Sequence, residues 1–324
     1  MFISKVSREF IIDERTSKQI WTLKAFAVFS IFFAHMPLAD SQTTPFSLIY
    51  EVLGWIGVPM FLVLSGLLYK PLNIQGWKRR FKRLLLPLFL WGTVTYLIHC
   101  LPSSTTFSMT GYGLWIIGSN TFLYFVWMLL SIMLLYQVFD SPFVWIFIGI
   151  GSIVLSQLDL IPYTSNWTPY LNPFNFIFYF SFGTLLRRRN LWEYRESLAL
   201  VIGAIFIFLT SYLLCLINSW NLFFNVHTML MQISITWILI SLVAQFRILP
   251  KFLIYVGKVS FLIYLMHIQF ASTINILALP LPYMQVIKVV VAFSAVLLLI
   301  YVMDFLTKKI PAMHRYRSVL GFID

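Results

Sequence analysis

Residues 197–217 read SLALVIGAIFIFLTSYLLCLI, an apolar run without a single charged side chain. A helix that crosses the hydrocarbon core of a bilayer needs about 20 predominantly apolar residues, and this run is long enough. A second run of this character lies at 283–306, where Lys288 and Asp304 are the only charged residues. The sequence therefore predicts a protein built from membrane-spanning helices.

The composition of the whole chain agrees with this prediction. Of its 324 residues, 60% are hydrophobic and 10% are charged, and the mean hydropathy is +0.86. Soluble domains are about 45–50% apolar and about 25% charged, so these values exclude both a soluble domain and a disordered chain. Two cysteines are too few for a disulfide framework or a metal cage. We expect a single all-α transmembrane domain over residues 1–324, with no metal site.

Apolar stretches long enough to span a membrane can be placed at about ten positions, and prolines interrupt the fifth and sixth. They predict a polytopic helical bundle of about ten transmembrane helices. The expected spans are 19–38, 46–69, 84–101, 113–139, 142–158, 173–186, 197–217, 225–246, 252–279 and 283–306.

The basic residues predict the orientation of the bundle. Cytoplasmic connections of membrane proteins carry an excess of Lys and Arg, and only Lys24 and Lys288 of the 23 basic residues lie outside five clusters on one predicted side. Both termini are then cytoplasmic. The net charge of +12 follows from this topology, so we expect no nucleic-acid partner. The clusters lie in the N-terminal segment 1–18, the connections 70–83, 187–195 and 247–258, and the C-terminal tail 307–324.

Two ionisable residues lie within the first expected span, where such groups are costly and are candidates for function. Lys24 and His35 are 11 positions apart, which places them on one helix face within about 20° and about 16 Å apart along the axis. Histidine is the commonest general base near neutral pH. The alternatives are that Lys24 snorkels to lipid headgroups and that His35 is a hydrogen-bonded residue at a helix end.

Four motifs in the same chain order resemble those of the acyltransferase-3 family of integral membrane O-acyltransferases. The first helix of that family carries Arg, ten residues and then His, and here Lys24 takes the Arg position before His35. The second helix, the basic loop and the ninth helix are similar to the family patterns G-V-P-x-F-F-x-x-S-G-F, R-x-x-R and G-x-x-S-Y-x-x-Y-L-x-H. The matching stretches are GVPMFLVLSGLL at 57–68, RFKR at 80–83 and GKVSFLIYLMH at 257–267.

The resemblance implies transfer of an acyl group, most often acetyl, from cytoplasmic acetyl-CoA or another acyl-CoA to a hydroxyl of a cell-surface polysaccharide or lipid-linked glycan. The protein would then be a multi-pass protein of a bacterial-type inner membrane. We expect His35 to be the general base, and an acyl group carried transiently on His35 is an alternative to direct transfer. Lys24 is the second catalytic candidate, although lysine lacks the planar fork of arginine.

The donor carries several phosphate charges, so the basic loop is its expected binding site. Arginine side chains bind phosphate through paired hydrogen bonds, and the candidates are Arg79, Arg80 and Arg83, with Ser65 of the second helix beside them. Arg80 and Arg83 would be neighbours if the loop is helical. The alternative is that the loop is basic only because it faces the cytoplasm.

The ninth helix supplies the expected acceptor-binding residues, His267 and Tyr264. His267 is alternatively the residue that orients His35, or a packed histidine without a role in chemistry. Two other classes of function compete with the acyltransferase: a transporter or flippase for a lipid-linked sugar, and a non-catalytic membrane subunit of a glycan-assembly complex. Acyl-CoA binding or hydrolysis by the purified protein separates the first class from these two.

Overall fold

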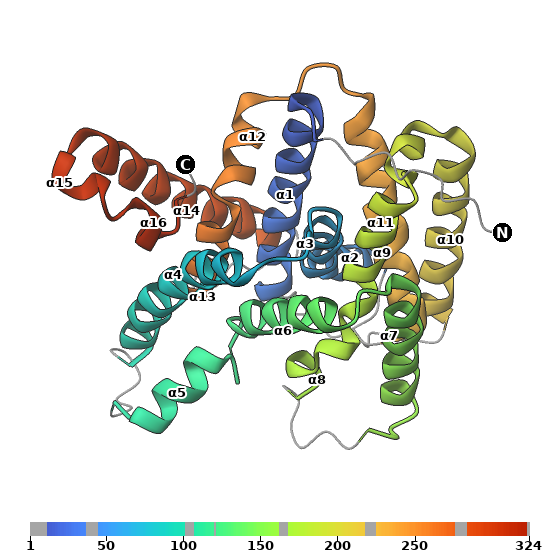
Figure 1. Cartoon of the computed structure of the whole chain (residues 1–324), viewed down its shortest axis with the longest axis horizontal. Coiled ribbons are helices and arrows are strands. Elements are labelled where there is room, and N and C mark those ends of the chain that lie inside the picture. Colours follow the sequence, from blue (N-terminus) through green and yellow to red (C-terminus); the bar gives the residue numbers. More distant parts are fainter. Residues whose placement is uncertain are drawn as a thin grey trace.

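The structure is a computed structural model that describes residues 12–36, 45–100, 107–119, 121–161, 168–217, 225–275 and 284–322. Within these residues the chain forms helices and turns and no strand, which confirms the all-α prediction (Figure 1). The longer helices are α1 (Glu14–His35), α2 (Pro45–Trp55), α3 (Gly57–Leu67), α4 (Ile74–Cys100), α5 (Met109–Ile117), α6 (Tyr124–Val138), α7 (Pro142–Gln157), α9 (Ile177–Arg188), α10 (Leu198–Ile217), α11 (Val226–Gln245), α12 (Lys251–Lys258), α13 (Ser260–Asn275) and α14 (Met284–Lys309). Shorter elements are α8 (Thr168–Leu171), α15 (Pro311–His314), α16 (Arg317–Leu320) and the 3₁₀ turns η1 (Pro173–Asn175) and η2 (Leu191–Glu196).

Several of these helices are long and apolar enough to cross a membrane. By length and composition, five of the described helical segments meet this condition, and the bent pair α12 and α13 makes up to six. The helices α6 and α7 are apolar but shorter. The protein is therefore a multi-pass membrane protein, while ten spans and cytoplasmic termini stay predictions. The five segments are Pro45–Leu67, which joins α2 and α3, Ile74–Cys100, Leu198–Ile217, Val226–Gln245 and Gln285–Lys309.

Two of the expected spans are broken in the structure. The span expected at 113–139 divides into α5 and α6 because Gly118 ends α5 in the left-handed conformation, with φ +89°. Glycine adopts this conformation without the steric cost that a side chain brings. The span expected at 252–279 bends by 80° between α12 and α13. Hydropathy averaged over a whole span did not reveal either break, because long apolar stretches flank the short turns at 118–121 and 257–260.

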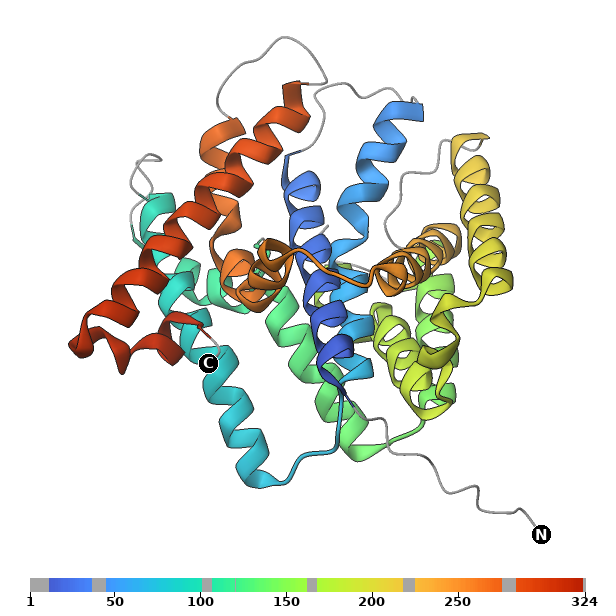
Figure 2. The same ribbon diagram turned by 90° about the horizontal axis from the view of Figure 1, so that it is seen from above.

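Helix α1 lies at the centre of the bundle and α10 at its edge. Figures 1 and 2 show α1 enclosed by other helices, and it packs against α2, α3, α11, α12, α13 and α14. The apolar stretch of α10 is only 17% buried, whereas that of α2 and α3 is 67% buried. A bilayer would cover the exposed apolar surface of α10, since lipid tails are as apolar as leucine. Four polar residues of α1 are buried inside the protein, namely Thr16, Gln19, Thr22 and Ser30.

Close backbone contact joins α3 to α9. A Cβ atom added to Gly66 would lie 1.9 Å from the Phe180 carbonyl oxygen, and one added to Gly183 would lie 1.9 Å from the Val63 carbonyl oxygen. Small residues allow membrane helices to approach in this way. The motif residue Gly66 therefore allows α3 to pack directly against the backbone of α9. This contact also fixes the position of Ser65, the residue before Gly66.

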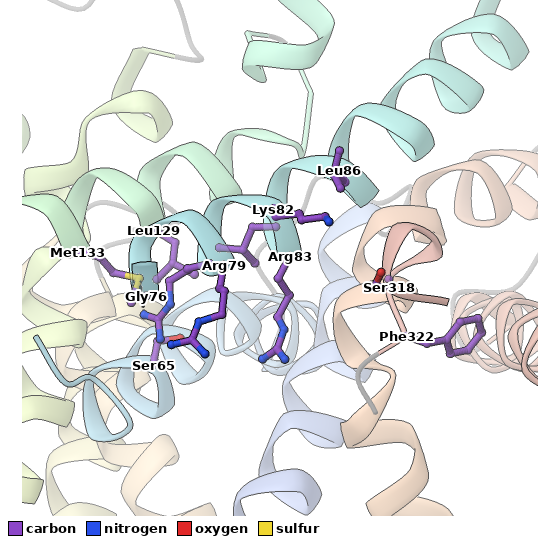
Figure 3. A pocket seen from close by; sticks show the side chains of 13 residues that line it. Ser65, Gly76, Arg79, Lys82, Arg83, Leu86, Leu129, Met133, Ser318 and Phe322 are labelled. Carbon is purple, nitrogen blue, oxygen red and sulfur yellow. Dashed lines mark hydrogen bonds between the residues drawn. The ribbon is translucent and has the colours of Figure 1, made fainter. Parts of the chain in front are cut away.

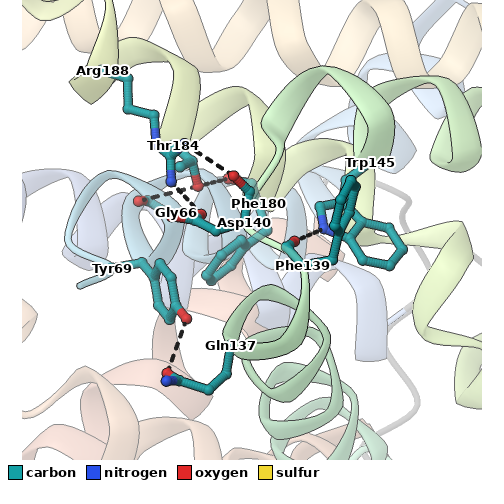
Figure 4. Close-up of polar contacts among 9 residues, drawn as sticks. All are labelled: Gly66, Tyr69, Gln137, Phe139, Asp140, Trp145, Phe180, Thr184 and Arg188. Atoms are coloured by element: carbon teal, nitrogen blue, oxygen red, sulfur yellow. Dashed lines mark hydrogen bonds and ion pairs between the residues drawn. The ribbon is translucent and has the colours of Figure 1, made fainter. Parts of the chain in front are cut away.

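Polar contacts join the ends of α3, α6 and α9, as Figure 4 shows. Arg188, at the end of α9, forms an ion pair with Asp140, which follows α6, and also donates to the Asp140 backbone carbonyl at 3.2 Å. The Tyr69 hydroxyl, just beyond α3, donates to the Gln137 side-chain oxygen at 3.5 Å. These contacts tie the ends of α3, α6 and α9 to one another.

Candidate active site

The two histidines that stood out in the sequence meet in the structure. His35 is the last residue of α1 and His267 lies in the middle of α13, and their ring centroids are 4.8 Å apart. The tertiary structure therefore brings together the histidines of the first and last motifs. We call these two residues the histidine pair.

The end of α1 is fixed by two side chains that the sequence analysis did not single out. The carbonyl oxygen of Met36 accepts a hydrogen bond from the Tyr50 hydroxyl at 2.5 Å and another from Gln285 Nε2 at 3.1 Å. Tyr50 belongs to α2 and Gln285 to α14, so three helices meet beside His35. Both side chains are polar groups inside apolar stretches, which was the one signal in the sequence that could have identified them.

The surroundings of His267 determine which of its nitrogens carries the proton. The side chain is fully buried, and its Nδ1 lies 2.5 Å from the carbonyl oxygen of Tyr264. A carbonyl oxygen can only accept a hydrogen bond, so Nδ1 carries the hydrogen and, in the neutral ring, Nε2 carries the free lone pair. Among the described residues, Nε2 has no hydrogen-bond partner. The histidine pair therefore contains a buried acceptor nitrogen that is unused in the structure.

Aromatic side chains enclose the histidine pair. The Phe122 ring lies 6.4 Å from His35 and 4.8 Å from His267, both edge-on, and the Phe32 ring lies 5.8 Å from His267. Tyr264 stacks on His267 at 5.7 Å, while its hydroxyl donates to the Phe122 carbonyl. That hydroxyl holds α13 against the start of α6, so Tyr264 positions the pair while its ring contacts His267.

Lys24 lies apart from the histidine pair. It is half-buried on α1, with about 16 Å of helix between it and His35. Among the described residues it forms no ion pair, and it is not part of the cavity described next. A lysine side chain cannot cross this distance, so Lys24 and His35 do not act on the same atom in this conformation.

A cavity of about 720 Å³ lies at the start of α4, where the basic run is helical, as the pairing of Arg80 with Arg83 required. We call it the cation cavity. Figure 3 shows Arg79 and Arg83 on the same side of α4. No carboxylate is among its lining residues, so the cavity suits an anion. The lining residues are Ser65, Gly76, Arg79, Arg80, Lys82, Arg83, Leu84, Leu86, Leu129, Met133, Ser318, Gly321 and Phe322.

The residues predicted to bind the donor therefore share one cavity, although they come from two helices. Arg80 is half-buried and places its Nη1 3.2 Å from the Met133 sulfur, which holds the guanidinium against α6. Arg79, Lys82 and Arg83 are exposed, so their charges are open to a ligand from solvent. The C-terminal part of the lining, Ser318 to Phe322, was not predicted, because only tertiary packing places it there.

Two helices connect the cation cavity to the histidine pair. On α6, Leu129 lines the cavity, and Phe122, whose ring lies beside both histidines, is seven residues earlier, just before α6 begins. On α13, Leu262 lies against Gly321 of the cavity wall, and His267 is five residues further, or about 7.5 Å.

The structure is thus an all-helical membrane bundle in which two histidines are in contact and a cavity is lined by basic side chains. Comparison with protein families identifies it further: the family model described as an acyltransferase domain matches residues 18–305. The chain belongs to the acyltransferase-3 family. In the same comparisons, no curated protein and no solved structure matches it.

Membership of the family indicates acyltransferase activity in a membrane-embedded protein, as the motifs predicted. The matched range contains the histidine pair, Lys24 and the arginines of the cation cavity, but ends before Ser318. Within the described residues, no group of three His, Cys, Asp or Glu side chains could hold a metal ion.

Proposed function

We propose that the protein transfers an acyl group, most often acetyl, from acyl-CoA to a hydroxyl of a cell-surface polysaccharide or lipid-linked glycan. The observation that carries this proposal is the contact between His35 and His267, with centroids 4.8 Å apart. Two imidazoles in contact, one of them fully buried, suit a reaction in which one proton is removed and returned.

The cation cavity is the proposed site of the donor's phosphates. Arg79, Arg80 and Arg83 supply planar guanidinium groups that can bind phosphate through paired hydrogen bonds, and Ser65 adds a hydroxyl. The thioester arm would extend between α6 and α13 toward the histidine pair. With the basic ends of the bundle in the cytoplasm, the cavity opens toward the compartment that holds acyl-CoA, in a bacterial-type inner membrane.

His35 is the proposed general base. It takes the proton of the acceptor hydroxyl while the hydroxyl oxygen forms a bond to the thioester carbonyl carbon. The carbon–sulfur bond then breaks, and the departing thiolate of CoA receives the proton from His35. Direct transfer is the simpler route, and an acyl group carried on His35 is the alternative.

His267 and Lys24 have different proposed roles. The free Nε2 of His267 accepts a hydrogen bond, either from the N–H of His35 or from the acceptor hydroxyl, and Tyr264 holds that ring in place. Lys24 lies too far along α1 to stabilise charge at His35 and does not line the cation cavity, so its proposed role is a contact with a part of the donor outside that cavity.

The direct test measures CoA thiol release by the purified protein in lipid nanodiscs, with acetyl-CoA as donor and an envelope polysaccharide as acceptor. We expect acceptor-dependent thiol release and a mass increase of one acetyl group on the glycan. His35→Ala should lower the rate by about 10²–10⁴-fold, and His314→Ala, which removes an exposed histidine of the C-terminal tail, should not. Absence of thiol release by the wild-type protein with any acyl-CoA would favour the transporter or the non-catalytic subunit.

A further inference from the structure

The C-terminal segment beyond α14 is part of the cation cavity. Ser318, Gly321 and Phe322 line it together with the arginines of α4, and Figure 3 shows Ser318 beside the helix that carries Arg83. This segment follows the range matched by the family, which ends at residue 305. The wall that it forms therefore lies outside the range that the family model matches.

Two anchors hold the segment in place. Arg317 is buried and donates to Asp304 of α14 at 2.9 Å and to the Thr307 hydroxyl at 2.9 Å. At the other end, Trp91 Nε1 of α4 donates to the Leu320 carbonyl at 3.0 Å. A buried charge requires a partner, so the ion pair of Arg317 with Asp304 fixes where the segment lies.

The local backbone then turns the chain back on itself at the cavity wall. Gly321 ends α16 with φ +101°, a conformation that favours glycine. The following amide, of Phe322, donates to the Arg317 carbonyl at 3.0 Å, and the Phe322 ring lies under the Arg317 guanidinium at 5.0 Å. This turn leaves Ser318 as the exposed side chain of the segment that faces the cavity.

We propose that residues 317–322 are a part of the donor-binding site, with the Ser318 hydroxyl as a ligand-contacting group and Arg317 as the residue that positions it. The inference rests on the proposed donor site and extends it to a segment outside the family domain. The ligand chemistry is that of an organic phosphate, because the facing side chains are arginines and a lysine without a carboxylate among them.

Coenzyme A is the probe, titrated into the full-length protein in nanodiscs. Ser318→Glu places a carboxylate at the cavity and should raise the Kd for coenzyme A at least about tenfold, since like charges repel. His314→Glu is the matched control, because it adds the same charge at an exposed residue of the same tail that does not line the cavity. We expect it to change the Kd by less than about twofold.

Arg317→Met tests the positioning role, with Arg315→Met as its control for the lost charge. We expect Arg317→Met to raise the Kd about fivefold and to speed hydrogen exchange of the 317–322 amides. The kcat at saturating acetyl-CoA should stay unchanged, because the segment does not reach the histidine pair. Arg317→Lys, which keeps the charge facing Asp304, should restore most of the affinity.

The outcomes separate this inference from the proposed function. Binding of coenzyme A by Ser318→Glu as tight as by His314→Glu would overturn the role of the segment. If Arg80→Ala with Arg83→Ala still weakened binding in that case, the donor site would stand without its C-terminal wall. No binding by the wild-type protein would overturn both proposals together.

Discussion

The imidazole of His35 lies 4.8 Å from that of His267, although 231 residues separate them in the chain and they belong to different helices. The contact depends on the hydrogen bonds of Met36 at the end of α1 and on the carbonyl of Tyr264 beneath His267. The predictions below test the pair, its supports and the cation cavity.

His267→Asn should lower kcat about tenfold to a hundredfold, which is less than the loss expected for the general base itself. The shorter amide can still donate to the Tyr264 carbonyl, but it lacks an acceptor at the position of Nε2. The KM for acetyl-CoA should not change, because the donor's phosphates bind elsewhere. Steady-state kinetics measure both constants, and an unchanged kcat would return His267 to a packing role.

Tyr50→Phe should lower kcat about threefold to tenfold, because the end of α1 loses one of the two donors to the Met36 carbonyl, which contributes about 0.5–1.5 kcal/mol. Tyr212→Phe is the control, since its hydroxyl donates to the Pro45 carbonyl and not to the Met36 carbonyl at the end of α1. Thermal unfolding of both variants measures how much stability each hydrogen bond contributes, and the buried bond of Tyr50 should contribute more than the exposed bond of Tyr212. If Tyr50→Phe and Tyr212→Phe lost the same fraction of kcat, the Tyr50 hydroxyl would contribute to stability alone.

Arg80→Ala combined with Arg83→Ala should raise the KM for acetyl-CoA about tenfold or more, since hydrogen bonds to charged groups contribute about 1.5–3 kcal/mol each. The kcat should change little, because the phosphates lie far from the thioester. Lys70→Ala with Lys78→Ala removes the same charge from exposed residues that do not line the cavity. The difference in KM between the two double variants should shrink at high salt, because exposed charges are screened. Equal effects on KM would show that the basic run reflects membrane topology and not donor binding.

Lys24→Met tests whether the cation on α1 takes part in transfer. Methionine keeps the apolar stem of lysine and removes its charge. If Lys24 contacts the donor, Lys24→Met should lose nearly all transfer activity. If Lys24 only extends to lipid headgroups, the variant should keep its activity. Lys24→Arg restores the residue of the family motif and should retain reduced activity, because the planar group enters a half-buried site. Transfer assays at matched protein levels decide, and near-normal rates for Lys24→Met would remove Lys24 from the site.

Much of the candidate site could be predicted because its residues are unusual in their local sequence. A histidine and a lysine inside an apolar helix, and arginines at one helical spacing, stand out without any knowledge of packing, since charged groups are costly in lipid. Whether the basic run is helical stayed open in the sequence, and the structure places Arg80 and Arg83 together within α4.

The amino-acid sequence by itself determined the membrane class, the all-helical fold and the family, because each depends on composition and short motifs read along the chain. Only the tertiary structure decided which motifs meet. The bend between α12 and α13, the contact of Gly66 with α9, and the ion pair that places Ser318 at the cavity all depend on packing between distant segments. Such packing has no periodicity in the sequence, because the partner of each residue lies on another helix.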